Sequence, residues 1–257
     1  MPGSTRAAVA VEDPSLDPKK FQDPLVTAKG ESRAVVSLRR LRTLWFNTGT
    51  LCNLTCRNCY IESSPKNDRL VYLSAAEVSE YLDEIERDAV GTEEIGFTGG
   101  EPFMNPEFPA MLEDALHREY RVLVLTNAIR PMMKMAQPLL ALRERYSRQL
   151  VVRVSLDHYS RSLHELERGP RSWDPAFAGL KWLIGEEFVV HVAGRRFSGE
   201  PDAALRAGYA RLFREHRLPI DAHDPVQLVL FPEMDATRMS PRSRRGAGTS
   251  SGSRPTQ

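Results

Sequence analysis

The chain has 257 residues, of which 41% are hydrophobic and 27% are charged, and its formal net charge is +1. This composition is typical of a globular protein with one large domain or two small ones. The near-zero charge gives no electrostatic reason for a nucleic acid or an anionic membrane to be the main partner. No apolar run approaches the ~20 residues that cross a bilayer. We therefore expect a cytoplasmic protein with no membrane partner.

Both ends of the chain differ in composition from its middle. Residues 1–36 are rich in Pro, Asp and Lys without periodicity, which predicts a disordered leader. Residues 236–257 are mostly Arg, Ser and Gly, which predicts a disordered basic tail. The tail begins so abruptly that it resembles the product of a truncation or a frameshift, and a natural basic tail is the alternative. The folded domain is expected between residues 37 and 235.

Short β-branched apolar runs alternate with amphipathic stretches along this domain. In chain order we predict a strand at 42–49, a helix at 74–90, a strand at 93–100, a helix at 105–120, a strand at 120–127, a helix at 132–146, a strand at 150–157, a helix at 174–185, a strand at 188–194, a helix at 202–216 and a strand from 226. Ser74 and Glu77 are spaced as a capping box at the start of the first helix. Strands that alternate with helices at roughly 30-residue spacing imply parallel βα units with right-handed crossovers. The predicted fold is α/β, a partial (β/α)6 TIM-like barrel with outer helices.

The three cysteines of the chain lie together, as Cys52, Cys56 and Cys59. An odd number of clustered cysteines favours metal chemistry in a reducing compartment over disulfides. Thiolates at this spacing in a loop can converge on an iron–sulfur cluster. A cubane of four irons needs one outside ligand for each iron, so three cysteines leave one iron open. The alternatives are structural zinc with a distant fourth ligand such as His117 or His158, three unpaired structural cysteines, or a strained disulfide with one thiol left over.

Two segments together resemble the radical S-adenosylmethionine (radical SAM) superfamily. "CNLTCRNCY", from Cys52, resembles the signature loop of that family, and "FTGGEP", from Phe97, resembles its Gly-Gly-Glu-Pro motif. The resemblance implies a 4Fe–4S cluster held by the three cysteines, with SAM chelating the open iron. It also implies that the methionine amino group of SAM is held by Gly99, Gly100, Glu101 and Pro102. The family commonly has an aromatic residue where this chain has Asn58, and the aromatic that follows, Tyr60, is a further candidate for cofactor binding.

Polar residues at two strand ends extend this candidate site. "LTNA" ends the third predicted strand and "VSLD" ends the fourth, and both resemble family positions that meet the carboxylate and ribose of SAM. Thr126 and Ser155 are the candidates for the carboxylate, and Asn127 and Asp157 are further candidates. The alternatives are a turn-capping amide for Asn127, a helix cap for Asp157 and, for the glycine pair, a tight exit from a strand. Position favours function, because parallel βα barrels carry functional groups at the C-terminal ends of their strands.

The resemblance covers roughly residues 42–235 and implies an enzyme. Its reduced cluster would cleave SAM to methionine and a 5'-deoxyadenosyl radical that abstracts hydrogen from an unknown substrate. A small-molecule or peptide substrate and a reducing donor such as flavodoxin or ferredoxin are the implied partners. The chain has no further cysteines for auxiliary clusters, so peptide-modifying subclasses that depend on them are not expected unless a C-terminal region is missing. The alternative is a truncated or partner protein that binds cluster and SAM without turnover. Nucleic-acid binding by the basic tail is disfavoured, because the tail lacks interleaved aromatics.

Overall fold

The computed structural model describes residues 22–35 and 37–232, and the chain divides into two units, Met1–Arg39 and Arg40–Gln257. In the first unit, Val26 and Ser32 form an isolated antiparallel bridge. The Thr27 N–H donates to the Glu31 carbonyl at 2.7 Å, so this part of the predicted leader has local backbone order. The rest of the predicted leader and the predicted tail lie outside the described residues.

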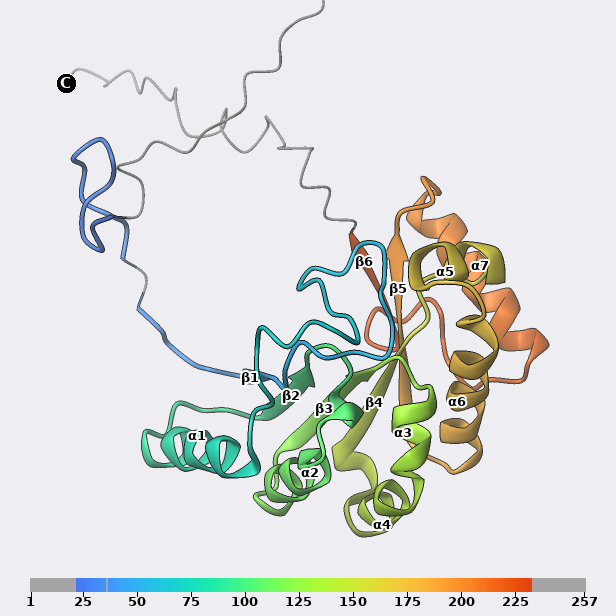
Figure 1. The fold of residues 1–257 in the computed structure, drawn as a ribbon, viewed down its shortest axis with the longest axis horizontal. Helices are drawn as coiled ribbons and strands as arrows, with labels where there is room; N and C mark the ends of the chain where they lie inside the picture. Colours follow the sequence, from blue (N-terminus) through green and yellow to red (C-terminus); the bar gives the residue numbers. More distant parts are fainter. Residues whose placement is uncertain (1–21, 36, 233–257) are drawn as a thin grey trace, which may run out of the picture. The chain divides into compact units, whose positions relative to one another are not determined.

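The second unit is built on one parallel sheet of six strands that follow one another in sequence order. The strands are β1 (Thr43–Asn47), β2 (Glu94–Thr98), β3 (Arg121–Thr126), β4 (Leu150–Ser155), β5 (Val189–Arg196) and β6 (Leu228–Pro232). Each strand pairs in parallel with the next, and the sheet curls with its helices outside (Figure 1). The predicted partial TIM-like barrel is confirmed. Its C-terminal strand ends all meet at one edge.

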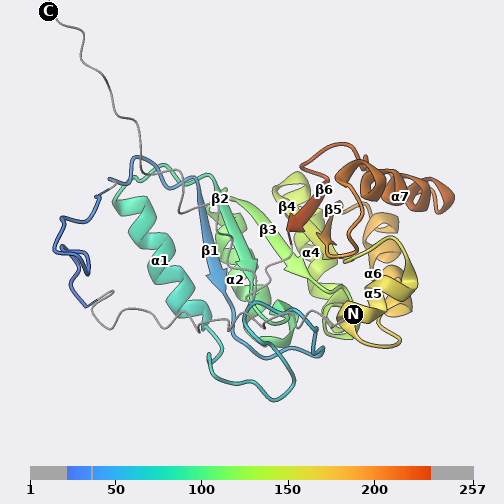
Figure 2. The same cartoon turned by 90° about the horizontal axis from the view of Figure 1, so that it is seen from above.

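The helices connect the strands along one side of the sheet (Figure 2). They are α1 (Ala75–Arg87), α2 (Phe108–His117), α3 (Arg130–Lys134), α4 (Ala136–Tyr146), α5 (Arg161–Arg168), α6 (Trp173–Gly185) and α7 (Asp202–Glu215), with short 3-10 turns at Pro102–Met104 and Ser147–Gln149. The predicted capping box of α1 is confirmed, since the Glu77 N–H donates to the Ser74 hydroxyl and the Ser74 N–H donates to the Glu77 carboxylate. Within the described residues no helix has the length and apolar character needed to cross a membrane.

Three connections differ from the prediction, one of them because α5 lies in a segment where no helix was predicted. The helix predicted at 132–146 is two helices, α3 and α4, which meet at Met135. The helix predicted from residue 105 begins at Phe108, because the Asn105 side chain accepts the Glu107 N–H and donates to the Leu73 carbonyl. At α2 the side-chain contacts of Asn105 decide where the regular hydrogen bonding starts.

The core lies between the sheet and the helices. On β4, Leu150, Val152 and Val154 are fully buried, while the alternate residues face the inner side of the curl and are only half-buried. Each fully buried aliphatic side chain contributes about 1.5–3 kcal/mol to folding. The helices therefore stabilise one face of the sheet and leave the inner face for other groups.

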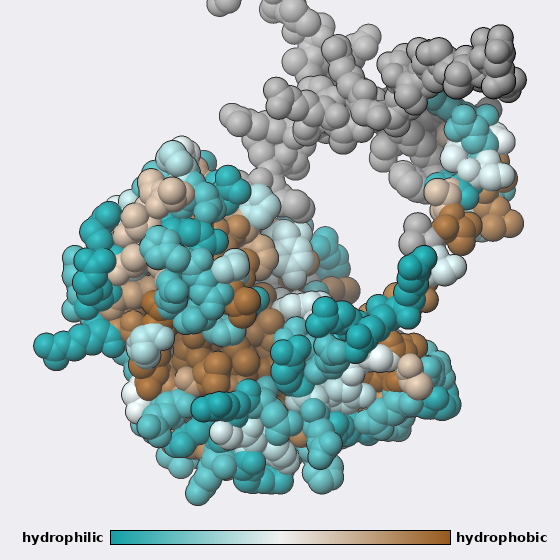
Figure 3. Space-filling view, turned by 180° about the vertical axis from the view of Figure 1, so that it is seen from behind, coloured by the Kyte–Doolittle hydropathy of each residue, from teal (hydrophilic) through white to brown (hydrophobic). Residues whose placement is uncertain are grey.

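The inner face carries an aromatic residue over a glycine. Trp45 pairs in register with Gly96, and a Cβ at Gly96 would lie 2.4 Å from the indole ring, so only glycine fits beneath it. Trp45 remains 44% exposed. In the space-filling view from behind, hydrophobic residues gather in the middle and hydrophilic residues surround them (Figure 3).

Candidate functional site

The glycine pair after β2 supports the chain that leads into the cysteine loop. The Gly100 N–H donates to the Gly49 carbonyl at 2.8 Å and the Glu101 N–H donates to the Leu51 carbonyl at 3.1 Å, which continues the β1–β2 pairing past the strand ends. A Cβ at Gly100 would lie 2.1 Å from the Leu51 carbonyl oxygen. Gly99 has φ +139°, which favours glycine. The glycines thus let the backbone just before Cys52 lie directly against the end of β2.

The three cysteines are free thiols on the loop after β1. Cys52 is 5% exposed and its sulfur accepts the Leu54 N–H at 3.4 Å, while the Cys59 sulfur accepts the Ser63 N–H at 3.3 Å. Burial raises the pKa of Cys52 to about 12 and also raises the pKa of Cys56. Burial therefore keeps the Cys52 and Cys56 thiols protonated until a metal centre displaces their protons.

Among the described residues the cysteine loop offers no site for a single metal ion. Thiolates around one zinc stand about 3.8 Å apart, given bonds of ~2.3 Å. In residues 22–35 and 37–232 no three His, Cys, Asp or Glu side chains are grouped closely enough to hold a single metal ion. A cluster binds each thiolate to a separate iron, so it needs a wider spacing.

His158 does not supply a fourth zinc ligand. Its Nδ1 accepts the Ser160 N–H at 2.9 Å, and its Nε2 lies 2.8 Å from the Glu200 carboxylate. Both ring nitrogens are therefore occupied. The other histidine considered from the sequence, His117, is the last residue of α2 on the helical side of the sheet.

Glu101 places a buried carboxylate at the ends of β2 and β3. It is 2% exposed. Its Oε1 accepts the Thr126 hydroxyl at 2.8 Å and the Phe103 N–H at 3.3 Å, and its Oε2 accepts the Asn127 N–H at 2.9 Å. Burial raises the pKa of Glu101 to about 7 although these three hydrogen bonds oppose the shift. Oε2 has one donor, so it retains a lone pair for a cationic ligand.

Asn127 joins this carboxylate to the cysteine loop. Its side-chain amide donates to the side-chain oxygen Oδ1 of Asn53 at 2.9 Å and to the Cys52 sulfur at 3.9 Å. Its own side-chain oxygen accepts the Ile129 N–H, which is the turn-capping role considered from the sequence. Four of the sequence-predicted residues, Cys52, Glu101, Thr126 and Asn127, therefore lie together in one hydrogen-bonded group.

Asp157 forms a buried ion pair that the sequence did not reveal. Its two carboxylate oxygens accept Nε and Nη2 of Arg168, at 2.8 and 2.9 Å. Burial disfavours the charged guanidinium, yet the Asp157 charge and its hydrogen bonds raise the pKa of Arg168 above its ordinary value. The helix-cap alternative for Asp157 is wrong, because the N-cap of α5 is Ser160. The only sequence signal for Arg168 was the Arg-Gly that ends the polar segment after β4.

The comparisons with known proteins agree with this arrangement. Residues 46–195 match the radical SAM superfamily. The chain belongs to this family. Radical SAM proteins use a 4Fe–4S cluster and S-adenosylmethionine.

Among curated relatives, the chain is 34% identical over 143 residues to the antilisterial bacteriocin subtilosin biosynthesis protein AlbA of Bacillus subtilis, a match that covers 55% of this chain and 30% of that protein. It is 31% identical over 191 residues to the mycofactocin maturase MftC of Mycobacterium tuberculosis, covering 72% of this chain and 46% of that one. The chain thus spans about a third to a half of the length of these relatives.

Solved radical SAM structures share the fold. Streptococcus suis SuiB bound to S-adenosylmethionine matches with a TM-score of 0.61 and 14% identity, over 77% of this chain and 42% of that chain. The structure of anSMEcpe with bound AdoMet matches with a TM-score of 0.56 and 17% identity, over 76% of this chain and 52% of that chain.

The remaining radical SAM candidates differ in their surroundings. Ser155 ends β4, half-buried on the inner face. Pro102 is buried at the start of a 3-10 turn whose Phe103 N–H donates to Glu101. Tyr60 is 68% exposed on the cysteine loop. The structure therefore places Ser155 and Pro102 at the same edge of the sheet as Glu101, where the strands end, and leaves Tyr60 at the surface.

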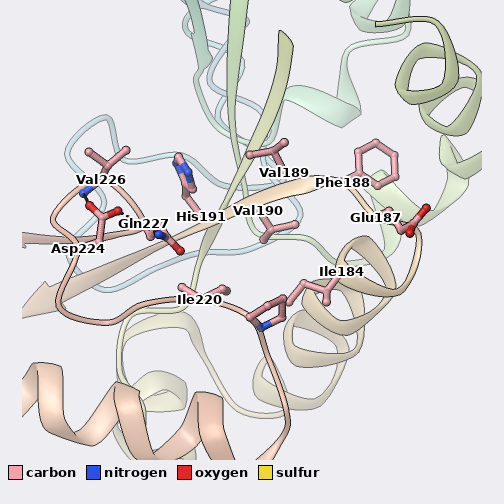
Figure 4. Close-up of a pocket in the computed structure, with 11 residues that line it drawn as sticks. Ile184, Glu187, Phe188, Val189, Val190, His191, Ile220, Asp224, Val226 and Gln227 are labelled. Atoms are coloured by element: carbon pink, nitrogen blue, oxygen red, sulfur yellow. Dashed lines mark hydrogen bonds between the residues drawn. The ribbon is translucent and has the colours of Figure 1, made fainter. Parts of the chain in front are cut away.

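The described part of the chain has a cavity near the C-terminal ends of the strands and another near their N-terminal ends. A groove of about 680 Å³ beside the cysteine loop is lined by Asn53, Phe103, Met104, Pro106, Arg130, Pro131, Lys134 and Met135. A second cavity of about 530 Å³ lies at the start of β5 and before β6 (Figure 4). None of the predicted site residues lines either cavity, although Asn53 and Phe103 of the first are chain neighbours of Cys52 and Pro102. In the second cavity, His191 is half-buried with Nδ1 3.5 Å from Arg153.

Proposed function

We propose that this chain is a radical SAM enzyme that holds a 4Fe–4S cluster on Cys52, Cys56 and Cys59 and cleaves S-adenosylmethionine reductively. The observation that carries the proposal is Asn127, because its backbone N–H donates to the Glu101 carboxylate and its side chain donates to the Cys52 sulfur. One residue thus joins a carboxylate suited to an ammonium with a thiol suited to iron. When bound, the cluster supplies the electron that cleaves SAM into methionine and a 5'-deoxyadenosyl radical, which abstracts a substrate hydrogen.

The protein's first task is to hold three sulfur anions. Loading releases the thiol protons, whose pKa values at Cys52 and Cys56 are raised by burial. The backbone N–H groups of Leu54 and Ser63 donate to the sulfurs of Cys52 and Cys59, and the Leu54 hydrogen bond favours the Cys52 thiolate. The Arg168 charge favours the Cys56 thiolate in the same way.

Glu101 is the proposed receptor for the ammonium of SAM. An ammonium against this carboxylate favours its charged form, so binding lowers the pKa of Glu101 from about 7. The N–H groups of Gly100 and Glu101 already donate to the cysteine loop. An ammonium only donates hydrogen bonds, so the carbonyl oxygens of Gly99 and Gly100 are the backbone groups proposed to receive it. Pro102 supports the site by starting the turn that gives Glu101 its Phe103 donor.

The other strand-end residues are assigned by what their side chains already do. Ser155 is the proposed donor to the SAM carboxylate, because no side-chain hydrogen bond occupies its hydroxyl in the described residues. The Thr126 hydroxyl donates a hydrogen bond to the Glu101 carboxylate and thereby orients it. Asp157 orients Arg168. Tyr60, an exposed aromatic of the loop, is the proposed contact for the adenine.

A peptide is the proposed substrate. The similar proteins include a bacteriocin biosynthesis protein, a mycofactocin maturase and SuiB, whose structure is also known bound to its precursor peptide SuiA. This chain spans less than half of each of these proteins, so its peptide substrate is proposed by analogy with them. A reducing protein such as flavodoxin or ferredoxin is the proposed electron donor. The proposed catalytic core is residues 37–235, in the cytoplasm.

The test is anaerobic reconstitution with iron and sulfide, reduction with dithionite, and assay of 5'-deoxyadenosine after addition of SAM. The proposal expects a bound cluster and SAM-dependent 5'-deoxyadenosine. If the EPR signal of the cluster responds to SAM but no 5'-deoxyadenosine forms, the chain binds cluster and SAM without turnover. If the protein instead contains zinc and no sulfide, both the enzyme and the cluster-binding protein are ruled out.

A further inference from the structure

Two residues lie between the second and third cysteines, and both are attached to the end of α5. The Arg57 N–H donates to the main-chain carbonyl of Glu167 at 2.7 Å. The Asn58 side-chain amide donates to the Glu167 carboxylate at 2.9 Å. One residue of α5 therefore holds the arc that separates Cys56 from Cys59, through both its backbone and its side chain.

The Glu167 side chain is only 3% exposed, so its carboxylate depends on protein partners. Asn58 provides one of them, and Nη1 of Arg195 lies 3.8 Å away. Nη2 of Arg195 donates to the main-chain carbonyl of Asn58 at 2.8 Å. Asn58 is therefore held at its amide by α5 and at its carbonyl by the end of β5.

The end of α5 is itself fixed to the sheet. Arg168, the next residue, makes the buried two-point ion pair with Asp157 just after β4. This anchor means that Glu167 is carried by a rigid element and not by the loop it contacts. Asn58 also departs from the aromatic residue that the resemblance leads one to expect, and an amide donor, unlike a phenyl ring, satisfies the Glu167 carboxylate.

We infer that Glu167 is a positioning residue for the cysteine loop, acting through Asn58 and Arg57 to keep Cys56 and Cys59 in their cluster-binding arrangement. The inference rests on the proposed function, because it assumes that these cysteines hold a cluster. Its consequence is that the loop is shaped before iron arrives, so Glu167 controls how long a cluster is retained.

The experiment compares Glu167→Ala, Glu167→Gln and Asn58→Ala after anaerobic reconstitution. The rate of iron loss to a ferrous chelator is measured, together with the reduction potential of the cluster. Loss of an outer partner of a metal ligand typically weakens metal binding about 10- to 100-fold, and we expect Glu167→Ala and Asn58→Ala each to accelerate iron loss by that factor. Glu167→Gln keeps an oxygen for the Asn58 amide and should restore most of the retention. The double variant Glu167→Ala/Asn58→Ala should lose iron no faster than either single variant, because both substitutions remove the same hydrogen bond.

Glu165→Ala is the matched control. Glu165 lies on the same helix, and its carboxylate accepts the Trp173 N–H and does not contact the cysteine loop. The control should lose iron at the wild-type rate. Wild-type retention in Glu167→Ala, or additive losses in the double variant, would overturn the inference.

A separate measurement covers two complications. If Glu167→Ala folds poorly, or if the wild-type chain takes up no cluster, hydrogen exchange of residues 52–60 is compared in the metal-free wild type, Glu167→Gln and Asn58→Ala, which removes the same hydrogen bond from the loop side. Faster exchange confined to this segment in Asn58→Ala supports the inference even when the proposed function fails. Unchanged exchange there overturns it.

Discussion

The two ends of the cysteine loop are held in different ways. Near Cys52 the chain is held by backbone hydrogen bonds to the end of β2, from Gly100 and Glu101. Near Cys59 it is held mainly by side chains, with Asn58 between Glu167 and Arg195. Backbone pairing makes no demand on side-chain identity except where a Cβ would collide, whereas the second end depends on a particular amide and a particular carboxylate.

This difference separates two kinds of sensitivity. At the first end a substitution disturbs the path of the chain itself, so stability and cluster binding should fall together. At the second end a substitution removes a contact and leaves the sheet intact, so cluster binding should change with little change in stability. The following experiments test that separation, from the largest expected effect to the smallest.

Removing a proposed ligand should have the largest effect. Cys56→Ala deletes one of three thiolates, and a cluster held by the remaining two would have two irons without a protein ligand. We expect the iron and sulfide content after reconstitution to fall to background while the circular dichroism spectrum stays that of the wild type. Full iron content in this variant would show that Cys56 is not a ligand.

Gly100→Ala should break the backbone-held end. Its Cβ would lie 2.1 Å from the Leu51 carbonyl oxygen, and backbone cannot move aside as a flexible side chain can. We expect the free energy of unfolding of the metal-free protein to fall by about 3 kcal/mol in urea denaturation. Gly185→Ala is the control, because nothing lies within 4 Å of the added methyl group. Equal stabilities of the two variants would refute the collision.

The pH dependence of stability should report Glu101, which lies at the backbone-held end. Burial raises its pKa from 4.5 to about 7, so the folded protein keeps this proton to higher pH than the unfolded chain does. The stabilisation is complete below pH 4.5 and is lost as the pH rises through 7. We expect the free energy of unfolding of the metal-free protein to fall by roughly 2–3 kcal/mol over this range. Denaturation of Glu101→Gln, which cannot ionise, should lack this slope, and an identical slope would assign it to another group.

Glu101→Ala should weaken SAM without removing the cluster. Hydrogen bonds to charged groups contribute about 1.5–3 kcal/mol, so SAM affinity should fall about 10- to 100-fold. The EPR signal of the reduced cluster, titrated with SAM, measures this affinity while iron analysis measures the cluster. Glu80→Ala, an exposed position on α1, serves as the control. If iron falls as far as it does in Cys56→Ala, Glu101 supports the loop and does not receive SAM.

Local patterns explain what the sequence could predict. Strand alternation, the Ser74–Glu77 capping box and the cysteine and glycine motifs are all set by residues close together in the chain, so the barrel and half of the site could be read directly. The contact between Asn58 and Glu167 joins residues 109 positions apart. No local pattern encodes such a pair, because it forms only when α5 packs beside the loop. The same holds for Arg153 and His191, 38 positions apart, which meet on the inner face of neighbouring strands.

Trp45 is an intrinsic fluorescent probe on the inner face of the sheet. Its indole lies flat over Gly96 on the inner side of the sheet and is still 44% exposed, whereas Trp173 is 7% exposed. Indole emission moves to shorter wavelengths when water is displaced from the ring. A ligand that displaces water from Trp45 on the inner side of the curled sheet should therefore shift the wavelength of its emission. Fluorescence spectroscopy can then follow ligand binding without a label.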